Sequence, residues 1–413
     1  MTAESPDITT DTAKDTAQRR AFLLRTAELL HQYGTPSHRL EPLMIEFSKT
    51  IGCEGMFLYT PTSLIISFGK GEEERTYLRR VDAGEVDAGK LIQFDEALED
   101  LEAGRTSLSF AAIKMEEIAA SPPTYGHILT VLACGVACGA VAVFLGANII
   151  GALTAILLGL GLAVLEMIVA PLKWDRGFVQ PVAGFLAAFG SIAVARFVSP
   201  IDDRLVTLAA LAIFLPGLRL TIALTELAMG HLSAGTARLA GAIASLLTLV
   251  VGVAIAWRMM DDWRRPVSEY ALPLPPWAWY VALAAAPPAF AILFRARIAQ
   301  WPVIFAVSLA GFAASLFGSR YLGLEAGPFL GALTVGIGAN LYARLANRPA
   351  LVALTPGMIL LVPGSLGYRS FTFLIDRETI AGVDFAFSML IVAMSVVGGL
   401  LAANAALPPK RNL

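Results

Sequence analysis

The sequence predicts an α-helical integral membrane protein with ten transmembrane helices in two five-helix inverted-topology repeats, preceded by a small soluble α+β domain. The 413 residues are 56% hydrophobic with a mean hydropathy of +0.66, which is too apolar for a soluble protein of this length. The charges are also unevenly divided, because residues 1–125 hold 13 Lys/Arg and 21 Asp/Glu, whereas the remaining 288 hold 18 and 12. An acidic soluble domain therefore precedes a membrane domain.

An internal duplication in the apolar part is the third observation. Each half holds about five apolar segments of membrane length, since about 20 residues cross the hydrocarbon. Because five is odd, the second copy enters the bilayer from the opposite side, which predicts inverted topology. The corresponding residues lie 147 or 148 positions apart: Pro216-Gly217 and Pro363-Gly364, Pro181 and Pro328, Gly184 and Gly331, and Arg196 and Arg344.

Five regions follow along the chain: a disordered leader, a cytoplasmic α+β domain, the first membrane repeat, a connecting loop and the second membrane repeat. Their predicted bounds are 1–16, 17–121, 122–257, 258–274 and 275–406. The first 20 residues lack the apolar core of a signal peptide, so we expect the domain to stay in the cytoplasm. An even number of crossings returns the carboxyl terminus to the same side, which suits a multi-pass protein of the cytoplasmic (inner) membrane.

The soluble domain shows helix and strand patterns in turn. A helical pattern starts at Ala17 and ends at Gly34-Thr35-Pro36, and Ser37 can cap a second helix that ends at Gly52. Two further helices precede the proline pair at 122–123. The expected strands span 55–60, 63–68 and 75–81, and the two later helices span about 88–103 and 106–120.

The membrane part contains ten apolar segments. We expect their centres near 136, 158, 188, 214, 246, 285, 308, 334, 358 and 392.

Two of these segments are interrupted by Pro-Gly pairs. Proline removes a backbone donor, and a bilayer tolerates an open backbone only where protein or a watery cavity surrounds it. A helix that restarts there offers N–H groups to a carboxylate, and the preceding half-helix offers carbonyls to an ammonium. The nearby hydroxyls either bind substrate or satisfy the loosened backbone. The candidate substrate-binding residues are Pro216, Gly217, Arg219, Thr221, Thr225, Pro363, Gly364, Ser365, Tyr368 and Arg369.

Carboxylates in apolar surroundings are candidates for proton coupling, because burial favours their protonated form. Glu226 and Asp384 are the first candidates and Glu166 is the third. The alternative for each is a structural ion pair with an arginine such as Arg219 or Arg238, or a position at the membrane interface.

A different class of function, a membrane-anchored enzyme, would depend on His31, His38 and Glu41 in the soluble domain. No nucleophile elbow or metal-binding helix motif accompanies them, so we expect capping and packing roles, no metal and no cofactor. Three cysteines give no disulfide framework, and no basic patch with interleaved aromatics suggests nucleic acid.

Four short motifs in this order resemble the threonine/serine exporter family. They are Tyr33-Gly-Thr-Pro-Ser-His-Arg-Leu-Glu41, Tyr59-Thr-Pro-Thr-Ser-Leu-Ile-Ile-Ser67, Phe214-Leu-Pro-Gly217 with Gly235-Thr-Ala-Arg-Leu239, and Leu361-Val-Pro-Gly-Ser-Leu-Gly-Tyr-Arg-Ser370. The resemblance implies a cytoplasmic domain, ten membrane helices and export of threonine and serine driven by the proton motive force. It supplies no binding residues.

The expected function is therefore secondary-active export of small hydroxy amino acids rather than enzyme catalysis. The expected partners are an amino acid, protons and the lipid bilayer, and a homodimer is plausible. A dicarboxylate exporter of the succinate type on the same scaffold is the nearest alternative, in which Arg219 and Arg369 would face the cavity.

Overall fold

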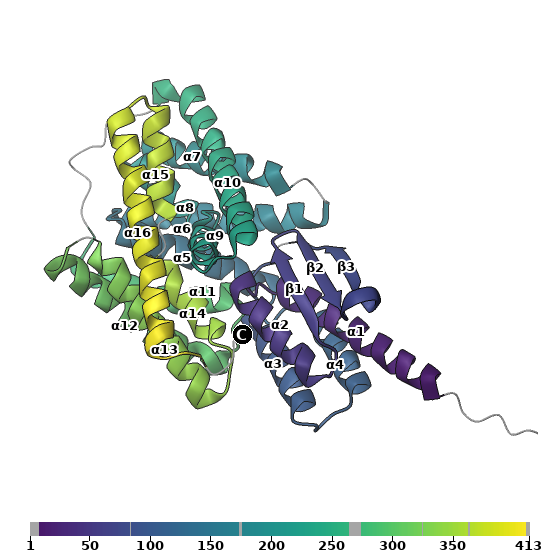
Figure 1. The fold of residues 1–413 in the computed structure, drawn as a ribbon. Coiled ribbons are helices and arrows are strands. Elements are labelled where there is room, and N and C mark those ends of the chain that lie inside the picture. The colour runs from purple at the N-terminus through teal and green to yellow at the C-terminus, as the bar shows by residue number, and fades with distance from the viewer. Residues whose placement is uncertain are drawn as a thin grey trace, which may run out of the picture.

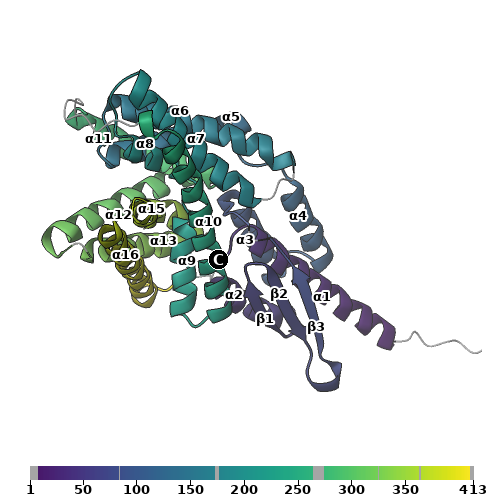
Figure 2. The same ribbon diagram turned by 90° about the horizontal axis from the view of Figure 1, so that it is seen from above.

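The chain forms a helical bundle with a small α/β unit docked against one of its ends (Figures 1 and 2). The computed structural model describes residues 8–82, 84–172, 176–263, 274–323, 325–361 and 364–409.

The soluble domain combines helices with one three-stranded sheet. The strands are antiparallel in the order β1-β2-β3, with Phe57 opposite Ile66 and Ile66 opposite Tyr77. The three predicted strands are confirmed, whereas the first helix begins at Ile8, inside the segment expected to be a disordered leader. The elements are α1 (Ile8–Gln32), α2 (Ser37–Thr50), β1 (Gly55–Thr60), β2 (Ser63–Phe68), β3 (Arg75–Arg80), α3 (Ala88–Glu102) and α4 (Leu108–Ala120).

Alternation along the strands explains the core of this domain. Phe57 and Tyr59 of β1, and Leu64, Ile66 and Phe68 of β2, are buried, while the residues between them point outward or are only partly buried. The apolar stripe of α2 packs on this face together with α1. Burial of these side chains removes a large apolar area from water and is the main source of the domain's stability.

The membrane part consists of twelve helices among the described residues. They are α5 (His127–Phe144), α6 (Ile149–Val169), α7 (Arg176–Phe197), α8 (Asp203–Ala210), α9 (Gly217–Ala228), α10 (Leu232–Met259), α11 (Pro276–Leu293), α12 (Trp301–Tyr321), α13 (Ala326–Ala346), α14 (Leu351–Met358), α15 (Gly364–Ile375) and α16 (Thr379–Ala406).

Eight helices in the described part of the chain are long and apolar enough to cross a membrane: α5, α6, α7, α10, α11, α12, α13 and α16. The two segments predicted around 214 and 358 are each divided into two short helices, α8 with α9 and α14 with α15. The structure thus has eight continuous candidate spans rather than ten. The two divided segments are the ones that carry the Pro-Gly pairs.

The succession of helices in the second half repeats that in the first. The paired helices α5/α11, α6/α12, α7/α13, α8/α14, α9/α15 and α10/α16 have 18/18, 21/21, 22/21, 8/8, 12/12 and 28/28 residues. Close crossings repeat as well. A side chain at Gly252 would collide with the carbonyl oxygen of Pro181, and one at Gly399 would collide with that of Phe329, so α10 on α7 and α16 on α13 approach through the same small residue.

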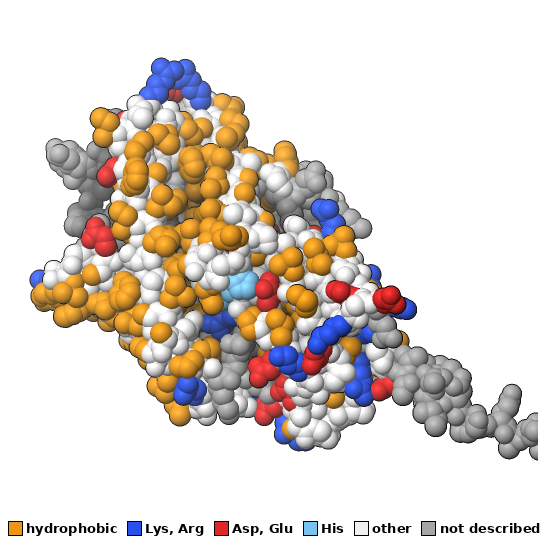
Figure 3. Space-filling model, in the orientation of Figure 1, with side chains coloured by type: hydrophobic (Ala, Val, Ile, Leu, Met, Phe, Trp, Pro, Cys, Tyr) orange, Lys and Arg blue, Asp and Glu red, His pale blue; other side chains and the backbone are white. Residues whose placement is uncertain are grey.

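The outer surface of the bundle is apolar where it would meet lipid. Figure 3 shows hydrophobic side chains covering the face formed by α10, α15 and α16. Val251 and Ile255 on α10, and Phe387 and Ile391 on α16, are exposed there. Exposed apolar patches of this extent are typical of membrane surfaces.

The domain docks on the ends of several membrane helices. The Ala88 N–H donates to the Phe294 carbonyl at 3.0 Å, and Arg295 pairs with Asp87 at 3.3 Å, so α3 rests on the turn after α11. Tyr125, just before α5, donates to the Ala296 carbonyl at 2.5 Å. The beginning of α5 and the end of α11 therefore lie together on the domain side.

Candidate functional site

The two Pro-Gly breaks lie against each other. Helix α9 begins at Gly217, with Pro216 at its N-cap, and helix α15 begins at Gly364. A Cβ atom added to Gly364 would lie 3.2 Å from the Gly217 Cα and 3.3 Å from its nitrogen. This contact is backbone to backbone, so only glycine fits at Gly364 without displacement. Pro363 lies outside the described residues.

Two helix amino termini from different halves of the chain thus meet at one point inside the bundle. The first N–H groups of a helix have no partner within it, and the aligned peptide dipoles place partial positive charge there. Such a pair of termini can bind a carboxylate without a basic side chain. The structure brings together Gly217 and Gly364 from positions 147 residues apart.

The hydroxyls beside the breaks mostly bond the backbone of their own hairpins. Thr221 donates to the Gly217 carbonyl at 3.2 Å, and Thr225 donates to the Thr221 carbonyl at 2.9 Å. Ser370 and Thr372 also donate to backbone carbonyls. This is the backbone-satisfying alternative that the sequence left open, and it leaves these hydroxyls with acceptor capacity only.

Tyr368 differs from these residues. Its side chain is 2% exposed, one helical turn after Gly364, and its hydroxyl has no hydrogen-bond partner in the described part of the chain. A buried hydroxyl without a partner is costly, so this group is available to a ligand. Ser365 is partly buried on the same short helix.

The two candidate arginines do not meet at the breaks. Arg219 is exposed. Arg369 is partly buried and its guanidinium lies over the ring of Phe385, 5.9 Å from the centroid.

The carboxylate of Glu226 is the most enclosed of the proton-coupling candidates. It is 0% exposed and accepts hydrogen bonds from Arg238 Nε at 3.0 Å and Nη2 at 3.1 Å. It also accepts from the Ser37 N–H at 3.0 Å. The structure therefore shows the ion pair with Arg238 that was the alternative to proton coupling, while Glu166 and Asp384 occupy exposed positions.

The Ser37 contact joins the soluble domain to the first break helix. Ser37 was expected to cap α2, but it is the first residue of that helix, Pro36 precedes it, and no side chain of the α2 terminus caps it. Glu226, which is 189 positions away, supplies an acceptor there instead. A carboxylate at a helix amino terminus is favoured by the helix dipole as well as by the hydrogen bond.

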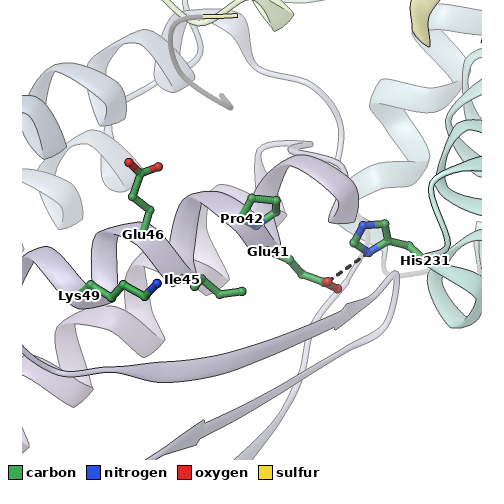
Figure 4. Close-up of a pocket in the computed structure, with 6 residues that line it drawn as sticks. All are labelled: Glu41, Pro42, Ile45, Glu46, Lys49 and His231. Carbon is green, nitrogen blue, oxygen red and sulfur yellow. Dashed lines mark ion pairs between the residues drawn. The ribbon is translucent and has the colours of Figure 1, made fainter. Parts of the chain in front are cut away.

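A groove of about 540 Å³ opens beside this contact (Figure 4). It is lined by Glu41, Pro42, Ile45, Glu46, Lys49 and His231. Glu41 pairs with His231 Nδ1 at 3.1 Å and accepts from the Tyr59 N–H at 3.2 Å. Sequence reasoning missed His231, because it follows α9 in an unremarkable turn and only the docked domain gives it a partner.

Of the histidines singled out in the soluble domain, His31 is buried and His38 partly buried, and both are uncharged at neutral pH. Burial is the main cause that lowers the pKa of His31, whose Nε2 lies 3.2 Å from the Pro61 carbonyl. Burial, followed by the charges of Arg39, His231 and Arg238, lowers the pKa of His38 to about 3. Within the described residues, no group of three His, Cys, Asp or Glu side chains could hold a metal ion.

Comparison with known proteins identifies the family. Residues 21–260 match the family model described as "Putative threonine/serine exporter", and residues 278–406 match "Threonine/Serine exporter, ThrE". No solved structure matches the chain.

Several fungal proteins are similar over most of this chain. The pheromone-regulated membrane protein 10 of Zygosaccharomyces rouxii is 26% identical over 86% of the chain and 37% of its own length. The protein of the same name from Saccharomyces cerevisiae is 24% identical, with shares of 94% and 54%. An uncharacterized protein of Schizosaccharomyces pombe is 28% identical, with shares of 85% and 48%.

The chain thus spans between about a third and about half of the length of these curated relatives. The two family models follow each other along the chain and together cover both halves of the duplicated bundle and most of the domain. The chain belongs to the threonine/serine exporter family.

Proposed function

We propose that the protein is a secondary-active exporter that moves threonine, serine or a similar small hydroxy amino acid out of the cytoplasm, coupled to protons. The observation that carries this proposal is the contact between Gly217 and Gly364, where two helix amino termini meet. A carboxylate binds at such termini, and the carbonyls that end the preceding short helices suit an ammonium. A zwitterionic amino acid satisfies both.

Inverted repeats explain how such a site serves two faces of a membrane. In our proposal α8 with α9 and α14 with α15 each complete one interrupted crossing, which makes five crossings per half. The first helix of the first half, α5, begins at the domain side, whereas its counterpart α11 ends there. This opposite direction supports the inverted arrangement. In our proposal the domain and the carboxyl terminus lie in the cytoplasm and the bundle lies in an inner membrane.

The two breaks touch in this structure, so transport requires that they separate to admit the substrate. A substrate shared between two repeats binds when the repeats part on one side and is released when they part on the other. In our proposal Tyr368, whose buried hydroxyl has no hydrogen-bond partner among the described residues, donates a hydrogen bond to the polar group of a bound hydroxy amino acid.

The test is uptake of labelled threonine or serine into everted vesicles or proteoliposomes with an imposed pH gradient. Gly364→Ala should lower transport at least about tenfold, because the added methyl separates the two termini. Gly241→Ala on α10 is the matched control, since nothing lies within 4 Å of a Cβ there. Transport by Gly364→Ala at the rate of the Gly241→Ala control would refute the site.

Proton coupling in this proposal belongs to Glu226, because it is the enclosed carboxylate and links the break helix α9 to the domain. Glu226→Gln keeps an acceptor for the Ser37 N–H but cannot release a proton. It should transport down a substrate gradient without responding to the pH gradient. Asp384→Asn and Glu166→Gln, at exposed positions, are the controls, and an unchanged response in Glu226→Gln would remove the assignment.

The dicarboxylate alternative has less support, because Arg219 and Arg369 do not converge on the breaks. Competition between succinate and threonine for uptake separates the two substrates. The enzyme alternative also has less support, since Glu41 is held by His231 and Tyr59 rather than by His31 or His38.

A further inference from the structure

Arg39, near the start of α2, is a buried cation without a counter-ion. Its side chain is 7% exposed, and its Nη1 atom is enclosed with no hydrogen-bond partner. Within the described part of the chain its side chain forms no ion pair and no hydrogen bond. Buried arginines in proteins are nearly always paired, because an enclosed charge without a partner is strongly unfavourable.

The guanidinium cannot escape this cost by losing its proton. Burial, the sole cause of the shift, lowers the pKa of Arg39 to about 10, so the group stays charged at neutral pH. An anion must therefore be supplied from elsewhere for the site to be satisfied.

Two carboxylates at this end of α2 are already engaged. Glu226 is held by Arg238 and by the Ser37 N–H. Glu41 is held by His231 and by the Tyr59 N–H. Neither has the freedom to serve as the counter-ion of Arg39.

Other polar groups at the same end of α2 also lack partners. The hydroxyls of Thr35 and Ser37 are buried and make no hydrogen bond, and neither does His38 Nδ1. His38 lies close enough for the charge of Arg39 to contribute to its lowered pKa, so its ring is neutral and can donate or accept a hydrogen bond. Unused polar atoms thus lie on four residues at this end of α2, namely Thr35, Ser37, His38 and Arg39.

The groove of Figure 4 runs along α2, and the first residue that lines it, Glu41, lies two positions after Arg39. Pro42 and Glu46, which line it, point to the same side of α2. Residues three and seven positions apart on a helix share a face, so Arg39 lies on the face of Pro42 and Glu46, one turn nearer the amino terminus.

We propose that Arg39 anchors a buried site for a small carboxylate at the inner end of this groove, with His38 and the hydroxyls of Thr35 and Ser37 as further hydrogen-bonding groups. A guanidinium binds a carboxylate through two parallel hydrogen bonds. This inference rests on the proposed function, in which the carboxylate is that of the exported amino acid, bound in the cytoplasmic domain before it reaches the breaks. A free dicarboxylate has the same chemistry and is the second possible source.

The experiment measures thermal unfolding and binding of the purified full chain in detergent with threonine, succinate or inorganic phosphate. Wild type, Arg39→Gln, Arg39→Lys and the control Arg79→Gln are compared. Arg79 is an exposed arginine of β3 that pairs with Glu28 at 3.4 Å. Gly364→Ala is included because it alters the break and leaves α2 unchanged.

Threonine or succinate should raise the melting temperature of wild type, Arg79→Gln and Gly364→Ala. Arg39→Gln should weaken this binding at least about tenfold, with Arg39→Lys in between, because lysine keeps the charge but not the paired geometry. Without ligand, Arg39→Gln should melt no lower than wild type, since it removes an unpaired buried charge. A structural arginine would behave in the opposite way.

Stabilisation by phosphate alone, unchanged carboxylate binding in Arg39→Gln, or no carboxylate binding in wild type would each overturn the site. Threonine binding at Arg39 identifies the exported amino acid as the source, and succinate binding identifies a dicarboxylate. If wild type binds through Arg39 but shows no gradient-driven transport, the proposed function fails and the site stands. If Gly364→Ala abolishes transport while Arg39→Gln binds normally, only the site fails.

Discussion

The helical hairpins α9–α10 and α15–α16 are built alike but held together by different chemistry. In both, a glycine near the start of the long helix packs on a leucine of the short one, Gly235 on Leu227 and Gly382 on Leu374. Yet Glu226 and Arg238 form a buried ion pair in the first hairpin. The residues 147 positions later, Phe373 and Phe385, stack with ring centroids 5.2 Å apart.

The difference follows from what covers each hairpin. The ion pair faces the soluble domain, whose α2 amino terminus completes the coordination of Glu226 through Ser37. The aromatic pair has no such cover from the domain, and stacked rings need no external partner. The same pair of helices can therefore be held together in two ways. An ion pair serves where the soluble domain supplies a further hydrogen bond, and stacked aromatic rings serve where it does not.

The largest expected effect comes from breaking the charged hairpin. Arg238→Ala leaves the buried Glu226 without its cation and should destabilise the protein by about 3–5 kcal/mol. The double variant Glu226→Phe, Arg238→Phe copies the other hairpin and should recover most of this loss, because replacing both partners by apolar groups is often neutral. Thermal unfolding in detergent measures both, and a double variant as unstable as Arg238→Ala would show that the hairpins are not equivalent.

Acid should affect the docked hairpin and its domain before the aromatic one. The pKa values of His31 and His38 are lowered in the folded protein, so their contribution to stability is complete above the ordinary histidine pKa of about 6.5 and is lost as the pH falls. His38, with a pKa of about 3, should lower the unfolding free energy by about 1.4 kcal/mol per pH unit between about pH 6 and 4, and His31, whose pKa is also lowered, should add to the loss.

Unfolding followed from pH 7 to 4 checks this slope. His38→Gln should reduce the slope of the unfolding free energy against pH by the contribution of one titrating group. Substitution of the exposed His127 by Gln should leave that slope unchanged. An equal slope in all three proteins would contradict the prediction.

The aromatic hairpin should be less sensitive to truncation. Phe373→Ala removes one partly buried ring and its stacking on Phe385, which should cost about 1–2 kcal/mol. A loss as large as that of Arg238→Ala would mean that the apolar pair carries as much of the fold as the charged one. The melting temperatures of the two single variants, measured side by side, decide this.

The smallest effect concerns the turns between the helices. Gly230 has a φ of +87°, and Arg377, at the equivalent turn, has a φ of +63°. Left-handed backbone costs a non-glycine residue about 1 kcal/mol or more, so Arg377→Gly should stabilise the second turn slightly. Arg369→Gly, in the interior of α15, is the contrasting control and should destabilise. A lower melting temperature for Arg377→Gly would argue against strain at this turn.

The regular elements and the position of the breaks were predictable because they leave local patterns. The alternation of apolar and polar residues predicted the three strands, and the length of the apolar runs predicted the membrane segments. The Pro-Gly pairs predicted where α9 and α15 begin. The duplication identified Gly217 and Gly364 as equivalent positions, but it did not predict that they touch.

The environment of Glu226 could be predicted only in part. Arg238 lies one hairpin away and was named as a possible partner, but Ser37 comes from another domain across 189 residues. His231 was missed for the same reason, since its partner Glu41 is reached only through docking. The local sequence pattern of a domain does not show which of its surfaces will pack against which turn of the membrane part.

The crossings at Gly252 and Gly399 decide which parts of the bundle can move. Because α10 touches the backbone of α7, and α16 that of α13, neither long helix can slide or rotate without steric collision. Each pair behaves as one rigid frame. The short helices that carry Gly217 and Gly364 are then the parts that can move. A conformational cycle in this protein would shift α9 and α15 while the pairs α7–α10 and α13–α16 stay in place.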